Sequence, residues 1–197
     1  MGIGTRFFRP RLVSSTRRRD DGDAALAAAR SEQFRLVMLP HLDSAYNFAR
    51  YLARDATAAE DIVQDAFLRA FRSFDSWRGD SAKSWLLTIV RNCFISSVAA
   101  RNGGEVVAAA EAVADVDTPE SILAARSDAA MVRATIESLP EPFRETLVLR
   151  ELEELSYKEI AQLTNVPIGT VMSRIARART MLAELLLSRD EGRRAQS

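Results

Sequence analysis

Four polar residues in the C-terminal third of the chain could contact nucleic acid. Thr170, Ser173, Arg174 and Arg177 fall on one side of a segment with helical periodicity. Hydroxyl and guanidinium groups on one helix face can donate hydrogen bonds to phosphates and to base edges in the major groove of duplex DNA. The pattern indicates a DNA-reading helix, although an amphipathic helical hairpin with a solvated arginine face fits the same residues.

Two short helices and a tight turn must position this polar face. Ser156 and Glu159 have the spacing of a capping box, which predicts a helix start. Asn165 suits the left-handed conformation that ends such a helix, and Pro167 suits the first turn of the next one. The second helix has apolar residues every three or four positions, which predicts a core-facing side: Val171, Ile175, Ala178, Leu182 and Leu185. The segment is predicted to be a helix-turn-helix.

A second polar row lies on a helix expected over residues 57–74, which starts with capping-box spacing between Thr57 and Glu60. Its predicted buried stripe is apolar: Ile62, Val63, Ala66, Phe67, Ala70, Phe71 and Phe74. Its other side carries an acidic row that ends in a leucine: Asp61, Gln64, Asp65 and Leu68. This row could dock a basic partner helix. A solvated acidic face, favoured by the helix dipole, explains it equally well.

The next segment combines aromatic and basic side chains. A loop is expected over residues 75–81 and a helix over about residues 82–100, in which Trp85 lies near Lys83 and Arg91. Rings can stack on unpaired bases while cations follow the phosphates, so the combination suits single-stranded nucleic acid. A core position for Trp85 is the stronger alternative when this helix is taken alone.

Composition excludes several classes of protein. The 197 residues include 27 Lys+Arg and 27 Asp+Glu, so nucleic-acid binding must depend on local charge, such as the six arginines within residues 1–19. The single cysteine, Cys93, excludes an internal disulfide framework and is expected in the core. One histidine, His41, leaves no zinc cluster and no supported nucleophile–histidine pair. We therefore expect no metal, no cofactor and no catalysis.

Hydropathy gives no sign of a membrane protein. No apolar run approaches the roughly 20 residues that span a bilayer. The arginine-rich start also lacks the apolar core of a signal peptide. The sequence predicts a cytoplasmic protein without membrane insertion.

Helical periodicity falls into two blocks on either side of an acidic stretch. Residues 101–120 hold five acidic residues against one arginine and are interrupted by Gly103, Gly104 and Pro119. Pro40 is expected to mark a boundary or kink in the first block. Because strand-like alternation is absent, the fold is predicted to be all-α with two small helical domains. The expected divisions are a flexible basic arm (1–30), a first domain (31–100), a flexible acidic linker (101–120), a second domain (121–189) and a disordered tail (190–197).

Three segments in this order resemble the extracytoplasmic-function (ECF) group of the sigma-70 family, the dissociable initiation subunits of bacterial RNA polymerase. They are AEDIVQDAFLRAFRSFDSWRG (59–79), KSWLLTIVRN (83–92) and LPEPFRETLVLRELEELSYKEIAQLTNVPIGTVMSRIARAR (139–179). The resemblance covers about residues 34–187. It implies that the two domains are sigma regions 2 and 4. It also implies that the chain directs core polymerase to specific promoters of a stress or envelope regulon, under anti-sigma control, without itself being an enzyme.

The resemblance gives each polar surface a role. The acidic row becomes a contact with the clamp helices of the polymerase β′ subunit: Asp61, Gln64, Asp65 and Leu68. The loop and helix that follow would bind and melt the minus-ten element and hold a flipped base: Asp75, Ser76, Trp77, Arg78, Lys83, Trp85, Arg91 and Asn92. The helix-turn-helix would read the minus-thirty-five duplex: Thr170, Met172, Ser173, Arg174 and Arg177.

Two residues depart from the pattern of such proteins. Met172 stands where they often carry Arg or Lys, and Ala176 stands where a larger aromatic or His side chain is common. The minus-thirty-five sequence therefore does not follow from the resemblance. The partners that it implies are core RNA polymerase, through its β′ and β subunits, promoter DNA and an anti-sigma factor.

Two other functions fit parts of the sequence. One is a decoy that sequesters an anti-sigma factor without initiating transcription, against which Trp85, Asn92 and the basic helix face argue. The other is a free-standing helix-turn-helix regulator that binds a dimeric operator. Such a regulator would bind promoter DNA alone, whereas a sigma factor that is neutral overall would need core polymerase.

Overall fold

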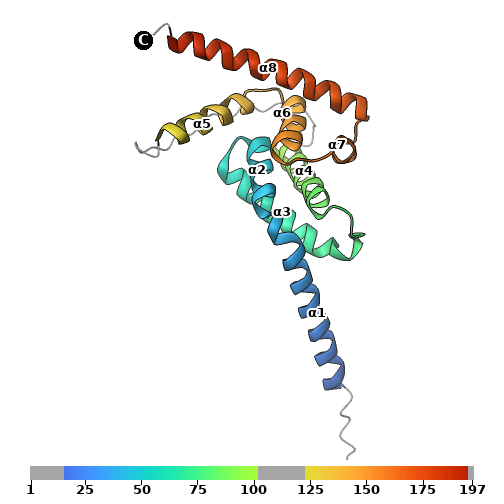
Figure 1. Cartoon of the computed structure of the whole chain (residues 1–197). Helices are drawn as coiled ribbons and strands as arrows, with labels where there is room; N and C mark the ends of the chain where they lie inside the picture. The colour runs from blue at the N-terminus through green and yellow to red at the C-terminus, as the bar shows by residue number, and fades with distance from the viewer. Residues whose placement is uncertain (1–15, 102–122, 195–197) are drawn as a thin grey trace, which may run out of the picture.

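The structure is a computed structural model that describes residues 16–101 and 123–194, with side chains for residues 24–101 and 130–188. Within these ranges the chain is helical and has no strand, so the all-α prediction is confirmed (Figure 1). The elements in chain order are α1 (Thr16–Met38), η1 (Leu39–His41), α2 (Leu42–Ala53), α3 (Ala56–Ser73), η2 (Phe74–Ser76), α4 (Ala82–Arg101), α5 (Leu123–Glu137), α6 (Glu141–Leu147), η3 (Val148–Leu152), α7 (Tyr157–Thr164) and α8 (Ile168–Arg194). Of these, η1 and η2 are 3₁₀ turns and η3 is a π-helical turn.

The N-terminal module is a bundle in which α2, α3 and α4 pack against one another. Apolar residues at helical spacing supply its core: Phe48, Leu52, Ile62, Ala66, Leu86 and Val90 are all buried. Pro40 lies in η1, which separates α1 from α2, so the predicted boundary is confirmed. A proline suits this position because the first residues of a helix have no intrahelical partner for their N–H groups.

The start of α3 differs from the sequence prediction. Asp55 is the N-cap residue, and its side chain accepts a hydrogen bond of 2.7 Å from the Ala58 amide. The predicted capping box of Thr57 and Glu60 is therefore wrong, because both residues already lie inside the helix. An aspartate two residues earlier satisfies a free amide of the first turn equally well.

The C-terminal module contains the predicted helix-turn-helix. Ser156 and Glu159 form the capping box of α7, and Asn165 ends that helix in the left-handed conformation with φ of 55°. The carbonyl of Pro167 accepts hydrogen bonds from the amides of Thr170 and Val171, which starts α8. The predicted inward residues of α8 are buried or packed against the core, so its buried face is fixed by α6 and α7.

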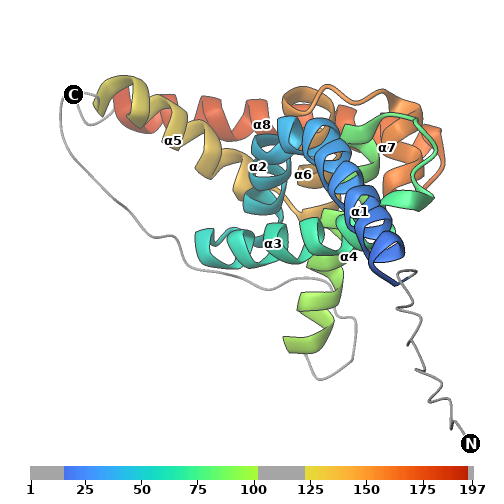
Figure 2. The ribbon, with the colours of Figure 1, turned by 90° about the horizontal axis from the view of Figure 1, so that it is seen from below.

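The helix before this motif is interrupted near Pro140 and Pro142. α5 ends at Glu137, and α6 begins at Glu141 with Pro142 in its first turn. Pro142 fits this position because proline is tolerated within a first helical turn. α5 and α8 run side by side in Figures 1 and 2.

Helix α1 changes the interpretation of the expected basic arm. The helix begins at Thr16 and continues through the expected boundary at residue 30, and it projects from the bundle in Figure 1. Periodicity alone does not reveal it, because long-range contacts from Arg30 and Phe34 hold its C-terminal half. Residues 1–15, the expected linker after Arg101 and the last three residues of the expected tail lie outside the described residues.

The two modules pack against each other in this structure. α4 contacts α7, and α2 contacts α6, so one continuous cluster of buried apolar side chains runs through both modules. Figure 2 shows the C-terminal helices lying across one end of the N-terminal bundle. The arrangement brings polar residues of α4 within reach of the C-terminal module.

Candidate nucleic-acid interface

The start of α8 exposes the predicted DNA-reading residues. Ser173 and Arg177 are exposed, Met172 is 52% exposed, and Thr170 and Arg174 are half-buried. The Ser173 hydroxyl donates to the carbonyl of Thr170 at 2.9 Å. Because the apolar side of α8 faces the core, this polar side is held at the surface. Its geometry suits insertion into a major groove.

The predicted docking row also lies at the surface. On α3, Asp61 and Gln64 are exposed, Leu68 is 51% exposed and Asp65 is half-buried. The carboxylate of Asp65 forms an ion pair of 2.8 Å with Arg69, one turn further along the helix. An exposed leucine beside carboxylates offers a partner both an apolar contact and negative charge.

The segment between α3 and α4 is organised by stacking and hydrogen bonds. The Trp77 ring stacks on Phe74 at 5.8 Å with an interplanar angle of 15°, and its Nε1–H donates to the carbonyl of Asp80 at 3.1 Å. Gly79 has φ of +82°, which a residue with a side chain rarely adopts. We name residues 75–81 the minus-ten loop, after their predicted role. Asp75, Ser76 and Arg78 are exposed on it.

The predicted cations of α4 are paired with acidic residues of the C-terminal module. Lys83 lies 2.8 Å from Glu153, and Arg91 lies 2.6 Å from Glu145. Glu153 and Glu145 are buried. Burial raises the pKa of Glu145, and the attraction of Arg91 opposes that rise. In this arrangement, each of the two α4 cations that were predicted to contact DNA already contacts a carboxylate.

The remaining minus-ten residues of α4 differ in exposure. Asn92 is exposed, while Trp85 is half-buried and packs against the core. Part of the Trp85 ring therefore packs against the core, which was the stronger alternative from the sequence. The rest of the ring reaches the surface. Cys93 is buried as predicted, and burial raises the pKa of its thiol to about 11, so it stays protonated at neutral pH.

Further contacts join the modules around a buried arginine. Arg50 pairs with Glu137 at 3.3 Å, and Arg54 donates to the carbonyl of Leu139 at 3.3 Å. Arg144 donates to that same carbonyl at 2.8 Å. Burial, with Arg54 nearby, lowers the pKa of Arg144 to about 10, so the guanidinium remains charged at neutral pH.

Sequence reasoning missed three polar residues that the structure brings to these surfaces. Glu145 and Glu153 contact the cations of α4, and Arg30 contacts Asp75 at the start of the minus-ten loop. Each contact joins residues at least 45 positions apart, so helical spacing gives no signal for it. A weak signal existed for Glu145, because it falls among the apolar residues of a helix.

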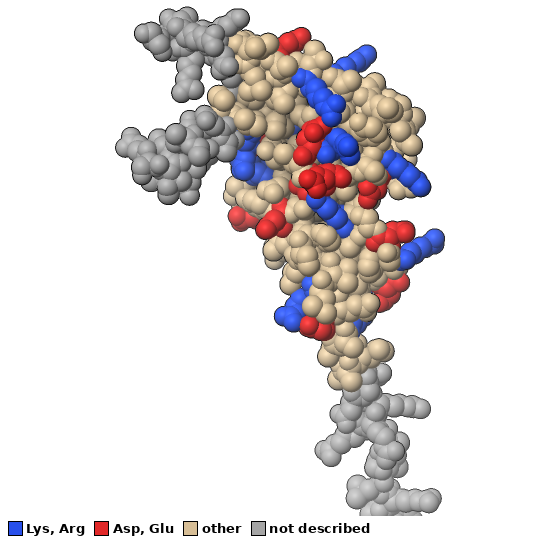
Figure 3. Space-filling model, viewed as in Figure 1, with Lys and Arg blue, Asp and Glu red and all other residues tan. Residues whose placement is uncertain are grey.

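Charge is mixed rather than concentrated on the visible face. Figure 3 shows basic and acidic side chains close to one another and no large area of one sign. Among the described residues, no cluster of three or more His, Cys, Asp or Glu is placed to hold a metal ion. None of the described helices is both long and apolar enough to cross a membrane.

Two family descriptions match the two modules. Residues 38–103 match sigma-70 region 2, and residues 129–182 match sigma-70 region 4. The first match contains α2, α3, the minus-ten loop and α4, and the second contains the helix-turn-helix. The order of the matches is the order of the two modules.

Similar proteins agree with these matches. The chain is 39% identical over 145 residues to the ECF RNA polymerase sigma-E factor of Haemophilus influenzae, covering 68% of this chain and 76% of that protein. It is 41% identical over 131 residues to the sigma-E factor of Escherichia coli K12, covering 60% and 69%.

Two solved structures share the fold. The sigma factor RpoE of Bartonella quintana, in complex with the anti-sigma factor NepR, has a TM-score of 0.61 and 28% identity over 79% of this chain and 95% of that one. CnrH, in complex with the cytosolic domain of CnrY, also has a TM-score of 0.61, with 26% identity over 82% and 94%. With both regions matched in order and relatives of this similarity, the chain belongs to the ECF group of the sigma-70 family of RNA polymerase sigma factors.

Proposed function

We propose that three surfaces of this sigma factor divide promoter recognition among them. Asp61, Gln64, Asp65 and Leu68 of α3 bind the β′ clamp helices of core polymerase. The minus-ten loop and residues 82–92 of α4 capture melted promoter DNA. The polar side of α8 reads the minus-thirty-five duplex. The observation that carries the proposal is that one chain combines a capped helix-turn-helix with a separate, exposed acidic row on α3.

The acidic row suits a protein partner better than DNA. Carboxylates at Asp61 and Asp65 repel phosphates, so they are unfavourable on a DNA-binding face. A basic partner helix would gain electrostatic complementarity from them and apolar contact from Leu68. This chemistry supports a docking role for α3 and DNA roles for the other two surfaces.

The minus-ten surface offers a place for an unpaired base. Trp77 provides a half-buried ring at the loop, Asn92 provides exposed hydrogen-bonding groups, and Arg78 is an exposed cation. Extruding a base costs a few kcal/mol, which stacking and cationic contacts can offset. The protein would supply binding and positioning, while polymerase supplies the chemistry of RNA synthesis.

The complexes of the two solved relatives support an anti-sigma partner for this chain as well. RpoE is bound to NepR, and CnrH is bound to the cytosolic domain of CnrY. We propose that such a partner controls this sigma factor in the cytoplasm, where it would prevent binding to core polymerase. The names of the sigma-E relatives support a regulon of the stress or envelope type.

A gel-shift experiment separates this function from its two rivals. Labelled promoter DNA is mixed with the full chain, with core polymerase, or with both. We expect a specific complex only when both are present, because the chain has no net charge to hold DNA by itself. A shift by the chain alone would favour a free-standing regulator. Absence of a specific complex under all three conditions would favour the decoy.

A further inference from the structure

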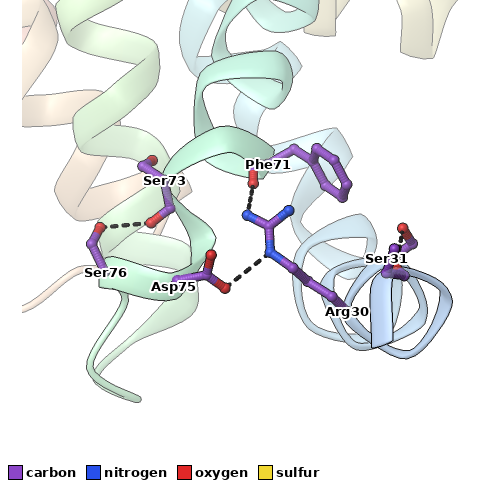
Figure 4. Close-up of polar contacts among 7 residues, drawn as sticks. Arg30, Ser31, Phe71, Ser73, Asp75 and Ser76 are labelled. Atoms are coloured by element: carbon purple, nitrogen blue, oxygen red, sulfur yellow. Dashed lines mark hydrogen bonds and ion pairs between the residues drawn. The ribbon is translucent and has the colours of Figure 1, made fainter. Parts of the chain in front are cut away.

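Arg30 of α1 contacts both the end of α3 and the start of the minus-ten loop. Its Nε–H donates to the Asp75 carboxylate at 2.9 Å, and its Nη2–H donates to the carbonyl of Phe71 at 2.7 Å. The guanidinium also lies over the Phe71 ring, 4.8 Å from its centre. Figure 4 shows the side chain reaching from α1 to the end of α3 and to η2. One residue therefore holds both the helix end and the loop that follows.

The guanidinium of Arg30 lies where a positive charge is stabilising. The carbonyl of Phe71 lies in the last turn of α3, where the helix dipole favours positive charge. The side chain of Asp75 is 75% exposed, and Arg30 is the one cation within ion-pair distance of it in the described part of the chain. Without Arg30, the Asp75 carboxylate would turn freely into solvent.

The buried ring of Phe34, one helical turn after Arg30, helps to position Arg30 against α3. Phe34 of α1 packs edge-on against Phe71 at 5.2 Å and against Phe74 at 5.3 Å. Phe74 in turn stacks on Trp77, whose ring donates to the carbonyl of Asp80. A continuous chain of contacts therefore runs from α1 into the minus-ten loop. Polar and aromatic contacts act on the same segment from the same helix.

We propose that α1 holds the minus-ten loop in the shape that receives a flipped promoter base, with Arg30 as the positioning residue. The proposal rests on the proposed role of that loop. Arg30 itself need not touch DNA. It restricts the loop before DNA arrives, which lowers the entropy lost on binding. Promoter melting therefore depends on a helix that precedes the matched region 2.

The test measures how Arg30 is coupled to the flipped base. Holoenzyme with Arg30→Ala is compared with wild type on forked minus-ten DNA, carrying either the normal base or an abasic site at each position in turn. We expect Arg30→Ala to weaken binding of the normal DNA about 5- to 20-fold and to leave binding of DNA that is abasic at the flipped position nearly unchanged. Arg30→Lys keeps the positive charge but loses the paired hydrogen bonds of the guanidinium, so we expect an intermediate loss of affinity.

Controls separate positioning from folding. Arg35→Ala removes an exposed ion pair with Glu32 on the same helix and is expected to have no effect. If Arg30→Ala weakens normal and abasic DNA equally, or weakens neither, the positioning role is contradicted. If wild-type holoenzyme shows no difference between normal and abasic DNA at any position, the proposed function of the loop itself fails. The two failures therefore give different results.

A different observation supports a second inference, on the contact between the modules. Lys83 and Arg91 of α4 cannot bind phosphates while Glu153 and Glu145 occupy their charged groups. Each glutamate belongs to region 4, and each cation belongs to region 2. We infer that region 4 closes over the minus-ten surface of the free protein, and that the modules separate before Lys83 and Arg91 contact DNA. This inference rests on the proposed DNA role of these two cations.

Isosteric substitutions of the two glutamates test the closure. Binding of a single-stranded minus-ten oligonucleotide to the full chain is measured for Glu145→Gln, Glu153→Gln and the double variant. We expect affinity to rise roughly 3- to 10-fold in the double variant, because a larger fraction of molecules is open, and X-ray scattering to report a larger radius of gyration. The affinity of each single variant is expected to rise by less. The single variants provide the test should the double variant fold poorly.

The control makes the same charge change as each single variant, at an ion pair that lies within one module. Glu151→Gln removes an ion pair of 2.6 Å with Arg179, and both residues lie in region 4, so no change is expected. Unchanged affinity and radius in the Glu145 and Glu153 variants would overturn the closure. Holoenzyme with Lys83→Ala and Arg91→Ala tests the DNA role separately, since unchanged minus-ten binding there would remove the premise instead.

Discussion

Charge reversal at Asp61 and Asp65 is expected to weaken association of the protein with core RNA polymerase strongly. Both carboxylates lie on the accessible side of α3, and the residues that hold the fold together lie on its buried side. Replacing both with arginine converts attraction to a basic partner into repulsion. We expect a loss of about 2–5 kcal/mol, or roughly 30-fold to several thousand-fold in Kd, measured by surface plasmon resonance with immobilised core.

A variant with the same change in net charge provides the control. Asp43 and Glu184 are exposed acidic residues away from the docking row, on α2 and α8. Reversing both of them to arginine is expected to leave core binding within about threefold of wild type, because long-range electrostatics are screened at physiological salt. Equal losses in the two double variants would mean that total charge, and not the row on α3, determines binding.

The second large effect is expected at the start of α8. Replacing both Arg174 and Arg177 with alanine removes the cationic side chains of the predicted recognition surface. We expect a loss of about 1–3 kcal/mol for each arginine that contacts a base. An arginine that contacts only phosphate instead lowers the salt slope of binding by about one. The measurement is holoenzyme binding to duplex DNA that carries the minus-thirty-five element, at several salt concentrations.

Arg179 is the matched control on the same helix. It is exposed and pairs with Glu151 at 2.6 Å, on a different side of α8 from Arg174. Arg179→Ala removes the same type of side chain and should change neither affinity nor salt slope. If Arg179→Ala weakens binding as much as the double variant does, the recognition surface lies elsewhere on α8.

Local rules predicted the helix-turn-helix well. Ser156, Glu159 and Asn165 act through hydrogen bonds and backbone conformations within a few residues, so their types and spacing carry the information. The buried stripe of α3 was predicted for a similar reason, since helical periodicity determines which residues share a face. Asp55 shows the limit of such rules, because two residues close together could each cap the same helix.

Long-range contacts could not be predicted in the same way. The sequence placed Lys83 and Arg91 correctly on one helix but gave no sign that Glu153 and Glu145 would contact them. α1 illustrates the same limit. Its sequence within the expected arm lacks amphipathic periodicity, and contacts of Arg30 and Phe34 with distant residues hold its C-terminal half. Tertiary packing, which a single sequence does not display, fixed both features.

One requirement applies to all three proposed surfaces. A sigma factor must bind polymerase and DNA with different surfaces, because both contacts persist in the same complex. The exposed rows on α3 and α8 meet this requirement, since they lie on different helices in different modules. The ion pairs of Lys83 and Arg91 support the inference that these two cations of the minus-ten surface become available only after the modules move apart.

Run-off transcription with purified core polymerase tests the promoter-selecting role most directly. Core enzyme is incubated with a library of promoter fragments, with and without the full chain, and the transcripts are sequenced. If the chain is a promoter-selecting subunit, defined transcripts arise only when it is present, and their templates share two sequence elements upstream of the start sites. If the chain binds core polymerase yet the transcripts match those of core alone, or if it fails to bind core at any salt concentration, that role is contradicted.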